Sequence, residues 1–380
     1  MNIGIITQPL LDNYGGLLQN YALQFVLKRM GHVPITLDQT KRSESWIRNT
    51  VRNTAIRILS FLGKSDGLKQ LPYLNKSQKR EISKHTRRFI DTYINHTKAF
   101  RNSKQISSYL KKHPLDAYIV GSDQVWRPKY CVNIYTQFLD FVNAPDVRRV
   151  AYAASFGTDE WTFSNRQTVR CSALVNRFDA ISVREKSGIA LCKNNLGIDA
   201  RQVLDPTMLL AKEDYVNLVE KEKEPVCDGD LFCYVLDMDP EKQSFIEKCA
   251  HQLNLTPFYS MPKPLQKENF TDSCLKDYIF PTVTHWLRGF LDAKMVIVDS
   301  FHGCAFSIIF NKPFWVIGNK SRGNTRFNSL LGLFGLENRM IEAGQVVDLT
   351  APINWEDVNT KLIKYKTDSY DWLKMQLKQL

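Results

Sequence analysis

The sequence has no run approaching the roughly 18 consecutive apolar residues of a membrane-spanning helix, and it has no internal repeat. Its first residues, MNIGIITQPL, lack the basic and then apolar layout of a secretory signal. Glycine and proline number only 18 and 15 in 380 residues, which excludes a collagen-like or low-complexity chain. We therefore expect a globular protein that is kept in the cytoplasm.

Recognisable cysteine motifs are absent as well. Eight cysteines are spread between residues 131 and 304, and none forms a CxxC pair or a Cys/His cluster with zinc spacing. The sequence therefore predicts reduced, mostly buried thiols, with no disulfide framework and no structural metal.

Two common phosphate-binding motifs are missing. The strand-like segment 3–7 leads to Gly15 and Gly16 and then to an amphipathic helix that ends near Gly31. These glycines do not make a GxGxxG fingerprint, and a GxxxxGK[ST] loop is absent. The strand, turn and helix predict the start of an α/β domain. From these residues alone, the glycines serve either close packing of the helix on the strand or a ligand at the helix start.

Positive charge is unevenly distributed along the chain. Lysine and arginine total 51 against 39 acidic residues, which gives a net charge of +12. Residues 41–112, here called the basic segment, contain 18 basic and four acidic residues, so their net charge is +14 and the rest of the chain sums to −2. The basic segment is therefore the part expected to face an acidic partner.

Within the basic segment, residues 45–63 have the pattern of an amphipathic helix. Trp46 lies on the apolar face with several aliphatic residues, while Arg48, Arg52 and Arg57 fall on or near the other face. Such a helix either lies at an anionic membrane surface or docks on its own domain with its arginines in solvent. A nucleic-acid partner is not expected, because no zinc finger or aromatic RNA-binding motif accompanies the charge.

Three short apolar segments, at 117–120, 180–183 and 295–298, are each followed by polar residues. Runs this short and apolar suit a parallel sheet buried on both faces. The polar residues are Ser122, Asp123 and Gln124 after the first segment, Arg184 and Glu185 after the second, and Asp299, Ser300, His302 and Gly303 in the third. Ligands of open α/β sheets bind beyond the carboxyl ends of the strands, so we expect one shared polar site.

Each of these residues also has a purely structural alternative. Asp123 could cap a turn, Arg184 and Glu185 could form an exposed ion pair, and His302 could be a satisfied core histidine. A helix that starts with histidine and glycine is nevertheless a ready anion site, because its free N–H groups and its dipole converge there.

Six motifs occur in order along the chain: NYGGLLQNYAL, IVGSDQVWRP, AYAASFG, ISVRE, VLDPTMLL and DSFHG. The ordered set resembles the polysaccharide pyruvyl transferase family from the N-terminus to about residue 335. It is far more specific than any single motif. Residues 41–112 and roughly the last forty residues lack the resemblance.

The resemblance implies two Rossmann-like domains that face each other across a cleft, as in GT-B glycosyltransferases. It places an acceptor-side domain at residues 1–205, with the basic segment as a helical insertion, and a donor-side domain at 206–354. In the crossing between them, Pro206 stops the preceding element from running on. Residues 355–380 are expected to form a C-terminal helix that packs back against the first domain.

The family's reaction moves pyruvate from phosphoenolpyruvate onto two hydroxyls of a sugar, which gives a cyclic ketal on a bacterial surface polysaccharide or its lipid-linked precursor. The resemblance therefore implies a transferase whose partners are phosphoenolpyruvate and a saccharide, with no cofactor and no metal. A lipid-linked acceptor would bring the enzyme to the inner face of the cell membrane, where the basic segment could make peripheral contact.

The residues for the anionic donor carry over from the family's motifs. Arg184 in SVRE and His302 in DSFHG match its donor positions, with Gly303 beside the histidine. Many members carry an arginine two residues before this histidine, whereas Ser300 stands there here, which removes a bidentate partner for a carboxylate or phosphate. The segment 318–331 either supplies the missing cation or is an ordinary basic loop. Its candidate cations are Lys320, Arg322 and Arg326.

Acid, base and acceptor roles follow from the residue types. His302 is the candidate acid or phosphate binder, because imidazole titrates near neutral pH. Asp123 and Glu185 are the candidate bases, between which the sequence does not choose. The expected acceptor residues are Asn13, Tyr14, Gly15 and Gly16 in the first turn and Ser122, Asp123, Gln124 and Trp126 after segment 117–120, since amides, hydroxyls and aromatic rings suit a sugar.

Two other functions share most of these features. A GT-B-type glycosyltransferase that uses a nucleotide sugar would have the same fold and the same phosphate site at a helix start. A non-catalytic glycan- or membrane-binding relative would keep the architecture and lose the site, with Ser300 as the lesion. The acceptor sugar, the ketal positions and the oligomeric state lie beyond the sequence.

Overall fold

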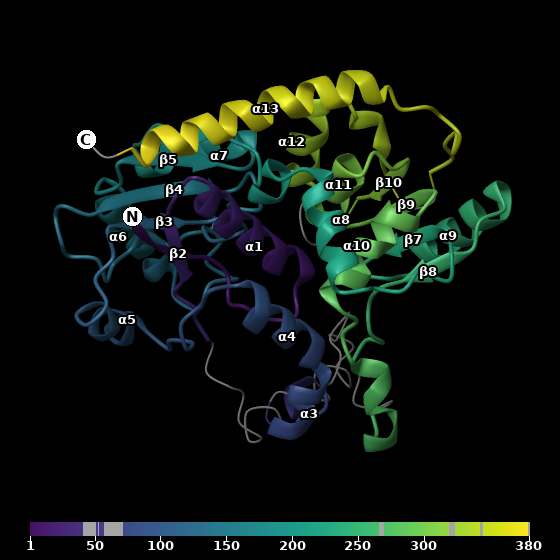
Figure 1. The fold of residues 1–380 in the computed structure, drawn as a ribbon, viewed down its shortest axis with the longest axis horizontal. Coiled ribbons are helices and arrows are strands. Elements are labelled where there is room, and N and C mark those ends of the chain that lie inside the picture. The colour runs from purple at the N-terminus through teal and green to yellow at the C-terminus, as the bar shows by residue number, and fades with distance from the viewer. Residues whose placement is uncertain are drawn as a thin grey trace.

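The computed structural model describes residues 1–40, 51, 53–56, 71–265, 270–318, 324–342 and 345–378. These residues form two halves, each built on a sheet whose neighbouring strands are parallel (Figure 1). In the described chain the first sheet has six strands in the order β2-β1-β3-β4-β5-β6, and the second has five in the order β11-β10-β9-β7-β8. The α/β class with two Rossmann-like domains facing each other is thereby confirmed.

The strands are short, and most of their residues are buried. Those of the first half are β1 (Asn2–Ile6), β2 (Val33–Thr36), β3 (Ala117–Val120), β4 (Arg148–Ala154), β5 (Ala180–Val183) and β6 (Arg201–Gln202). Those of the second half are β7 (Leu231–Tyr234), β8 (Pro257–Tyr259), β9 (Met295–Val298), β10 (Phe314–Ile317) and β11 (Met340–Ile341). All four residues of β3 and all four of β9 are buried, because helices cover both faces of the sheets. The three predicted segments thus coincide with β3, β5 and β9.

The helices alternate with the strands. In the first half they are α1 (Tyr14–Arg29), α3 (Lys76–Ile82), α4 (Lys84–Tyr93), α5 (Ser103–Leu110), α6 (Asn165–Val175) and α7 (Lys186–Leu191), with a π-helix at Cys192–Leu196. In the second half they are α8 (Lys212–Lys221), α9 (Pro240–Leu253), α10 (Val283–Asp292), α11 (Phe301–Ile309), α12 (Thr325–Phe334) and α13 (Trp355–Gln376). Short 3-10 helices occupy Ile134–Phe138, Pro206–Leu209, Asp272–Tyr278 and Glu337–Arg339.

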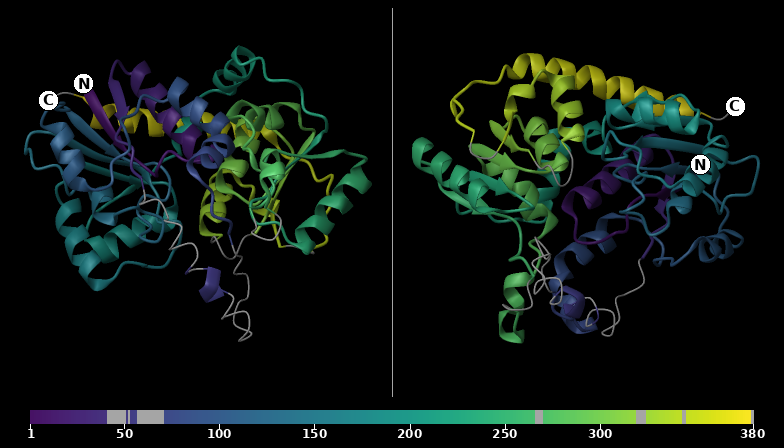
Figure 2. Two further views of the ribbon diagram at one scale, coloured as in Figure 1. Left: turned by 90° about the horizontal axis from the view of Figure 1, so that it is seen from below. Right: turned by 180° about the vertical axis from the view of Figure 1, so that it is seen from behind.

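Much of the basic segment lies outside the description. Residues 41–50, 52 and 57–70 are among those that the structure does not describe, so the predicted helix at 45–63, with Trp46 and its three arginines, cannot be followed there. Residues 53–56 are helical, and α3, α4 and α5 complete the described part. Helix α3 contacts the 3-10 helix Asp272–Tyr278 of the other half, below the two sheets in Figures 1 and 2.

Helix α1 is buried on more than one side, which the sequence pattern did not indicate. One side packs on the first sheet, and Tyr14, Leu17 and Leu18 belong to a cluster that includes Met208, Trp286 and many other residues of the second half. This cluster, here called the shared core, runs without a break from one half to the other. The ring of Tyr14 stacks on Trp286 at 5.9 Å, and its hydroxyl donates to the Pro281 carbonyl at 3.0 Å. The halves are therefore held together by apolar burial.

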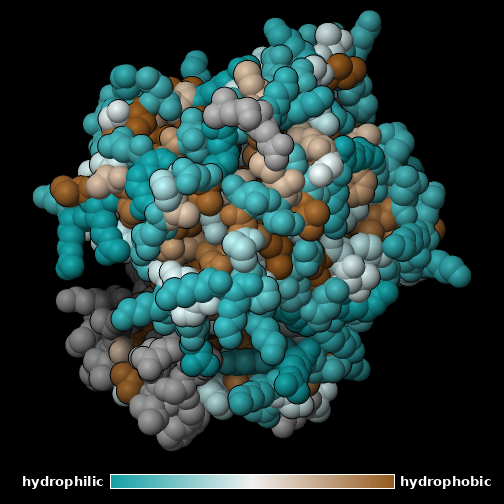
Figure 3. Space-filling model, turned by 60° about the vertical axis from the view of Figure 1, so that its left-hand side comes forward, coloured by the Kyte–Doolittle hydropathy of each residue, from teal (hydrophilic) through white to brown (hydrophobic). Residues whose placement is uncertain are grey.

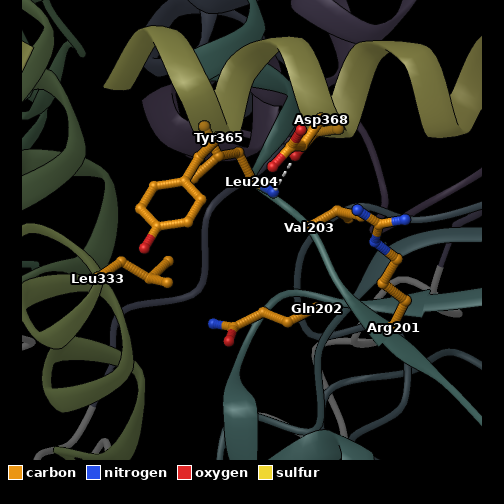
Figure 4. A pocket seen from close by; sticks show the side chains of 8 residues that line it. Arg201, Gln202, Val203, Leu204, Leu333, Tyr365 and Asp368 are labelled. Atoms are coloured by element: carbon orange, nitrogen blue, oxygen red, sulfur yellow. Dashed lines mark hydrogen bonds between the residues drawn. The ribbon is translucent and has the colours of Figure 1, made fainter. Parts of the chain in front are cut away.

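The chain crosses between the sheets at residues 203–211, and the predicted boundary at 205 falls in this crossing. Helix α13 lies across both halves in Figures 1 and 2, and its Ser369 hydroxyl accepts a hydrogen bond of 3.0 Å from the Leu204 N–H (Figure 4). Between the crossing, α12 and α13 lies a cavity of about 160 Å³, with Tyr365 and Leu333 on one side and Gln202 on the other. Helix α13 thus contacts the crossing directly and fixes its position through this hydrogen bond.

Three further features concern the surface, the cysteines and the length of the apolar helices. Hydrophilic side chains surround smaller apolar patches on the face in Figure 3. Most of the eight cysteines are buried, as expected. Among the described residues, no helix is both long enough and apolar enough to cross a membrane.

We expect Trp286→Ala to lower the free energy of unfolding by about 3–5 kcal/mol, because its fully buried ring contacts Tyr14 across the shared core. Urea unfolding followed by circular dichroism measures this, and both halves should unfold in one transition that shifts as a whole. Val226→Ala, at a side chain 66% exposed, is the control and should stay within about 0.5 kcal/mol. Two separate transitions, of which only one shifts, would contradict a core shared by the halves.

Candidate active site

The ends of β3 and β5 bring three charged side chains of the first half together. Arg184, directly after β5, places Nη1 at 3.0 Å from Asp205 Oδ2 and Nη2 at 3.4 Å from Asp123 Oδ1. The guanidinium is almost completely buried. Burial disfavours its charge, but the nearby carboxylates, Asp123 first, outweigh burial and raise the pKa of Arg184. Arg184 is therefore a fixed cation between two carboxylates, and the alternative of an exposed ion pair with Glu185 is excluded.

Glu185 faces the turn after β4. Its Oε1 accepts hydrogen bonds from the Ser155 hydroxyl at 3.0 Å and from the N–H groups of Phe156 and Gly157 at 2.7 and 3.0 Å. The side chain is buried, and Oε2 has no hydrogen-bond partner. Glu185 therefore stabilises this turn through Oε1, while Oε2 remains without a hydrogen bond among the described residues.

His302 enters from the second half, in the first turn of α11. The Ser300 hydroxyl caps this helix by accepting a hydrogen bond from the Gly303 N–H at 3.1 Å. Gly303 packs closely on β9, since a Cβ there would lie 2.7 Å from the side chain of Val298. The imidazole is mostly buried, with Nε2 at 3.7 Å from Asp205 Oδ2. Ser300 thus has a local structural role at the position where many family members carry arginine.

The glycine turn before α1 holds this histidine. A Cβ built on Gly15 would lie 2.2 Å from Nδ1 of His302, so only glycine fits at this position. Asn13 caps α1 by accepting a hydrogen bond from the Gly16 N–H at 3.1 Å. The starts of α1 and α11 therefore meet at one point, and two sets of helix-end N–H groups converge there.

A cavity of about 70 Å³ lies at this meeting point. The first half lines it with Asn13, Gly15, Asp123 and Gln124, and the second with Ser300, His302 and Arg326. Tyr130 and Tyr234, which the sequence analysis did not single out, also line it. The polar residues predicted after β3 and β9 thus line one cavity, which lies at the boundary between the halves.

Arg326, one of the three candidate cations of residues 318–331, lines the cavity. It lies in the first turn of α12 and is only 7% exposed. Burial, and then the charge of Arg184, lower the pKa of Arg326 to about 10, which leaves it charged at neutral pH. The other two candidates, Lys320 and Arg322, lie outside the described residues.

Four residues predicted for the acceptor do not line this cavity: Gly16, in the first turn of α1, and three buried residues. Trp126 is fully buried and stacks on Phe138 at 5.1 Å, so it belongs to the core of the first half. Tyr14 belongs to the shared core. Ser122 does not line the cavity, and its hydroxyl lies 2.9 Å from Asp205 Oδ2. Their positions in the sequence did not distinguish these buried side chains from Asp123 and Gln124, which line the cavity.

The sequence analysis did not name the buried carboxylate of Asp205 as a site residue, and it named the buried Asp299 only as part of the polar strand end, without a role. Burial by itself would raise the pKa of Asp205, but its interaction with His302 and the charge of Arg184 prevail and hold that pKa well below its usual range. Asp299 accepts hydrogen bonds from the N–H of Leu236 at 2.7 Å and from the Lys242 ammonium at 2.9 Å, and it lines the cavity. The DPT and DSFHG motifs contain both residues, and the signal for Asp205 was its place in the crossing.

The fold and the site define a two-domain α/β protein with an anion-suited pocket between its domains. The family model for "Polysaccharide pyruvyl transferase" matches residues 13–321, well over half of the chain. The chain therefore belongs to the polysaccharide pyruvyl transferase family, as its motifs predicted, and it is a transferase.

Solved structures with a similar course of the chain are distant in sequence. The UDP-GlcNAc 2-epimerase from Methanocaldococcus jannaschii is 13% identical, with a TM-score of 0.49, and the match covers 96% of this chain and 91% of that one. A glycosyltransferase from Rickettsia africae ESF-5 is 12% identical, with a TM-score of 0.44 and coverages of 99% and 93%. No curated protein matches the chain. The family assignment therefore rests on the family model, and the fold on the two sheets.

We expect Gly15→Ala to lower the free energy of unfolding by about 1–3 kcal/mol, because the new methyl group displaces the ring of His302. Gly16→Ala is the matched control one residue on. The atoms nearest to its Cβ would be those of the Asn13 side chain, at 3.3 Å, and alanine favours a helix, so stability should change by less than about 1 kcal/mol. Equal losses in the two variants, measured by urea unfolding, would show that His302 does not lie against Gly15 in solution.

Proposed function

We propose that this protein transfers pyruvate from phosphoenolpyruvate onto two hydroxyls of a sugar, and that it thereby builds a cyclic ketal on a bacterial surface polysaccharide or its lipid-linked precursor. The observation that carries the proposal is the meeting of two helix N-termini with His302 and Arg326 at one cavity. Membership of the family supports the reaction class. The donor and the acceptor are the parts that experiment must establish.

The donor is a small molecule with a phosphate and a carboxylate, and each needs cations or N–H groups. The starts of α1 and α11 supply N–H groups, and Arg326 supplies a guanidinium from α12. Arg184 is engaged with Asp123 and Asp205, although its Nε is buried without a hydrogen-bond partner. We assign Arg326 the place of the arginine that Ser300 replaces, and Arg184 the task of fixing the two carboxylates.

The reaction needs one acid and one base. His302 protonates the methylene carbon of phosphoenolpyruvate, and a sugar hydroxyl attacks the adjacent carbon as Asp123 takes the hydroxyl proton. The C–O bond to phosphate then breaks, and phosphate leaves with the proton that Asp123 has taken. The second hydroxyl attacks the same carbon to close the ketal and gives its proton to His302, which restores the acid. Asp123 is the better placed of the two candidate bases, since it lines the cavity while Glu185 is bound to the turn after β4.

The acceptor sugar would lie toward the first half. Asn13 and Gln124 offer amides there, and the half-buried Tyr130 offers a ring, which together suit hydroxyls and a sugar face. Pockets that bury a drug-sized ligand measure about 300–1,000 Å³, well above the roughly 70 Å³ found here. Binding of both substrates therefore requires the cavity to widen.

We expect phosphoenolpyruvate to raise the thermal stability of the protein and nucleotide sugars to leave it unchanged. Selective binding adds about 2.7 kcal/mol at a ligand concentration one hundred times Kd. Arg326→Gln should lose most of this stabilisation, whereas Arg166→Gln, at an exposed position on α6, should keep it. Differential scanning fluorimetry with each ligand measures both effects.

The same experiment distinguishes the alternatives. Stabilisation by nucleotide sugars alone would indicate a glycosyltransferase. Stabilisation by neither ligand would indicate a non-catalytic glycan- or membrane-binding relative.

We further propose that the basic segment holds the enzyme at the cytoplasmic face of an anionic membrane, where a lipid-linked acceptor is located. Residues 71–112 contain eleven lysines and arginines and two acidic residues, and all eleven basic side chains are exposed. Only a few of them have acidic partners, such as Arg87 with Asp91. Each basic residue near such a surface contributes about 1 kcal/mol, so a few of them would give reversible attachment.

We expect the protein to co-sediment with vesicles that contain anionic lipid at low salt and to be released at 1 M salt, where the screening length is about 3 Å. Replacing Lys76, Lys79 and Arg80 of α3 by glutamine should weaken binding several-fold. The matched control replaces three exposed lysines: Lys364 and Lys374 of α13, which lies on the opposite side of the molecule, and Lys378 just after this helix ends. An equal effect of the two triple variants would show attraction by net charge alone, without a docking surface.

A further inference from the structure

The imidazole of His302 is held at two edges by two different elements. The edge with Nδ1 faces Gly15 of α1, which itself lines the cavity. Nε2 lies 3.7 Å from Asp205 Oδ2, and it is buried without a hydrogen-bond partner. Rotating the ring by 180° would put a C–H group in place of Nε2 beside this carboxylate, so the observed orientation is electrostatically preferred.

The carboxylate of Asp205 is itself fixed from the first half. Oδ1 accepts hydrogen bonds from the N–H and the hydroxyl of Thr207 at 3.0 and 2.8 Å. Oδ2 lies 2.9 Å from the Ser122 hydroxyl and 3.0 Å from Nη1 of Arg184. The side chain is completely buried, so Asp205 cannot turn away from His302 without leaving these partners.

We propose that Asp205 is a positioning residue that pairs with Nε2 of His302 and thereby leaves Nδ1 as the nitrogen that delivers the proton to the donor. This assignment rests on the proposed function for the proton transfer itself. In its charged form the imidazole carries hydrogen on both nitrogens. After the transfer Nδ1 has lost its proton to the methylene carbon, and Nε2–H remains directed at Asp205.

The charges around His302 act in both directions. Asp205 in the crossing and Asp123 after β3 favour the imidazolium, while Arg184 after β5, Arg326 on α12 and the N-terminal end of α1 oppose it. Asp205 is the carboxylate within 4 Å, and Arg184 already neutralises part of its charge. Removal of the Asp205 charge should therefore shift the balance toward neutral imidazole.

The test begins with the ligand-free wild-type protein, which needs no assumption about the substrate. With ¹⁵N-labelled histidine, we expect the Nδ1 signal of His302 to report loss of the proton as pH rises, while Nε2 stays protonated. His302→Gln identifies the signal. Loss of the proton from Nε2 in place of Nδ1 would overturn the assignment, whether or not phosphoenolpyruvate is the donor.

Asp205→Asn then tests the positioning role. We expect kcat for phosphate release to fall at least tenfold with little change in KM for phosphoenolpyruvate, and the alkaline limb of the pH profile to move to lower pH. Asp214→Asn is the matched control, since Asp214 joins the halves through Arg29 at 2.7 Å outside the site. It should lower stability without moving the profile.

The variants separate this proposal from the proposed function. If Asp205→Asn keeps the wild-type profile and the wild-type His302 titration, Asp205 does not position the histidine. If wild type releases no phosphate but Nδ1 titrates as described, the arrangement of the histidine stands and the proposed reaction is wrong. The titration of His302 can be measured in the wild-type protein alone. A poorly folded Asp205→Asn protein would therefore not prevent a test of the assignment of Nδ1.

Discussion

The buried carboxylate of Asp205 is the group on which the site depends, because it touches both halves of the protein. Its partners are Arg184 and the hydroxyl of Ser122 from the first half, and His302 from the second half. Removing one partner of a buried ion pair typically costs about 3–5 kcal/mol, since the other charge stays buried without compensation. The crossing between the sheets is therefore more than a linker, because it carries the charge around which the polar groups are arranged.

A second constraint comes from the two helix starts. Asn13 caps α1 and Ser300 caps α11, and Gly15 allows the second helix to bring its histidine against the first. Any side chain at residue 15 would clash with the ring of His302. Of the two alternatives that the sequence left open, the close packing is observed, and it places His302 at the cavity, while a ligand at this helix start stays a prediction.

The sequence predicted the elements of the site better than their contacts. The apolar segments before Asp123, Arg184 and His302 became β3, β5 and β9 with the expected bounds, because short buried parallel strands have a strong local signal. The burial of Tyr14 and Trp126 depends on partners far along the chain, Trp286 for one and Phe138 for the other. Periodicity contains no information about such partners. For the same reason Asp205 was recognised only as part of the crossing.

The shared core sets the cost of opening the site. Separating the halves along α1 would expose the buried side of this helix, with Leu17 and Leu18, together with the ring of Trp286. Exposing apolar surface costs about 25 cal/mol per Å², so full separation is strongly disfavoured. The cavity borders this core at the start of α1, away from most of the apolar contact. Widening the cavity by movement at Asn13 and Tyr130, which do not belong to the shared core, would leave that core intact. The less costly route for a substrate is thus local movement at the polar end, with Asp205 and His302 still paired behind it.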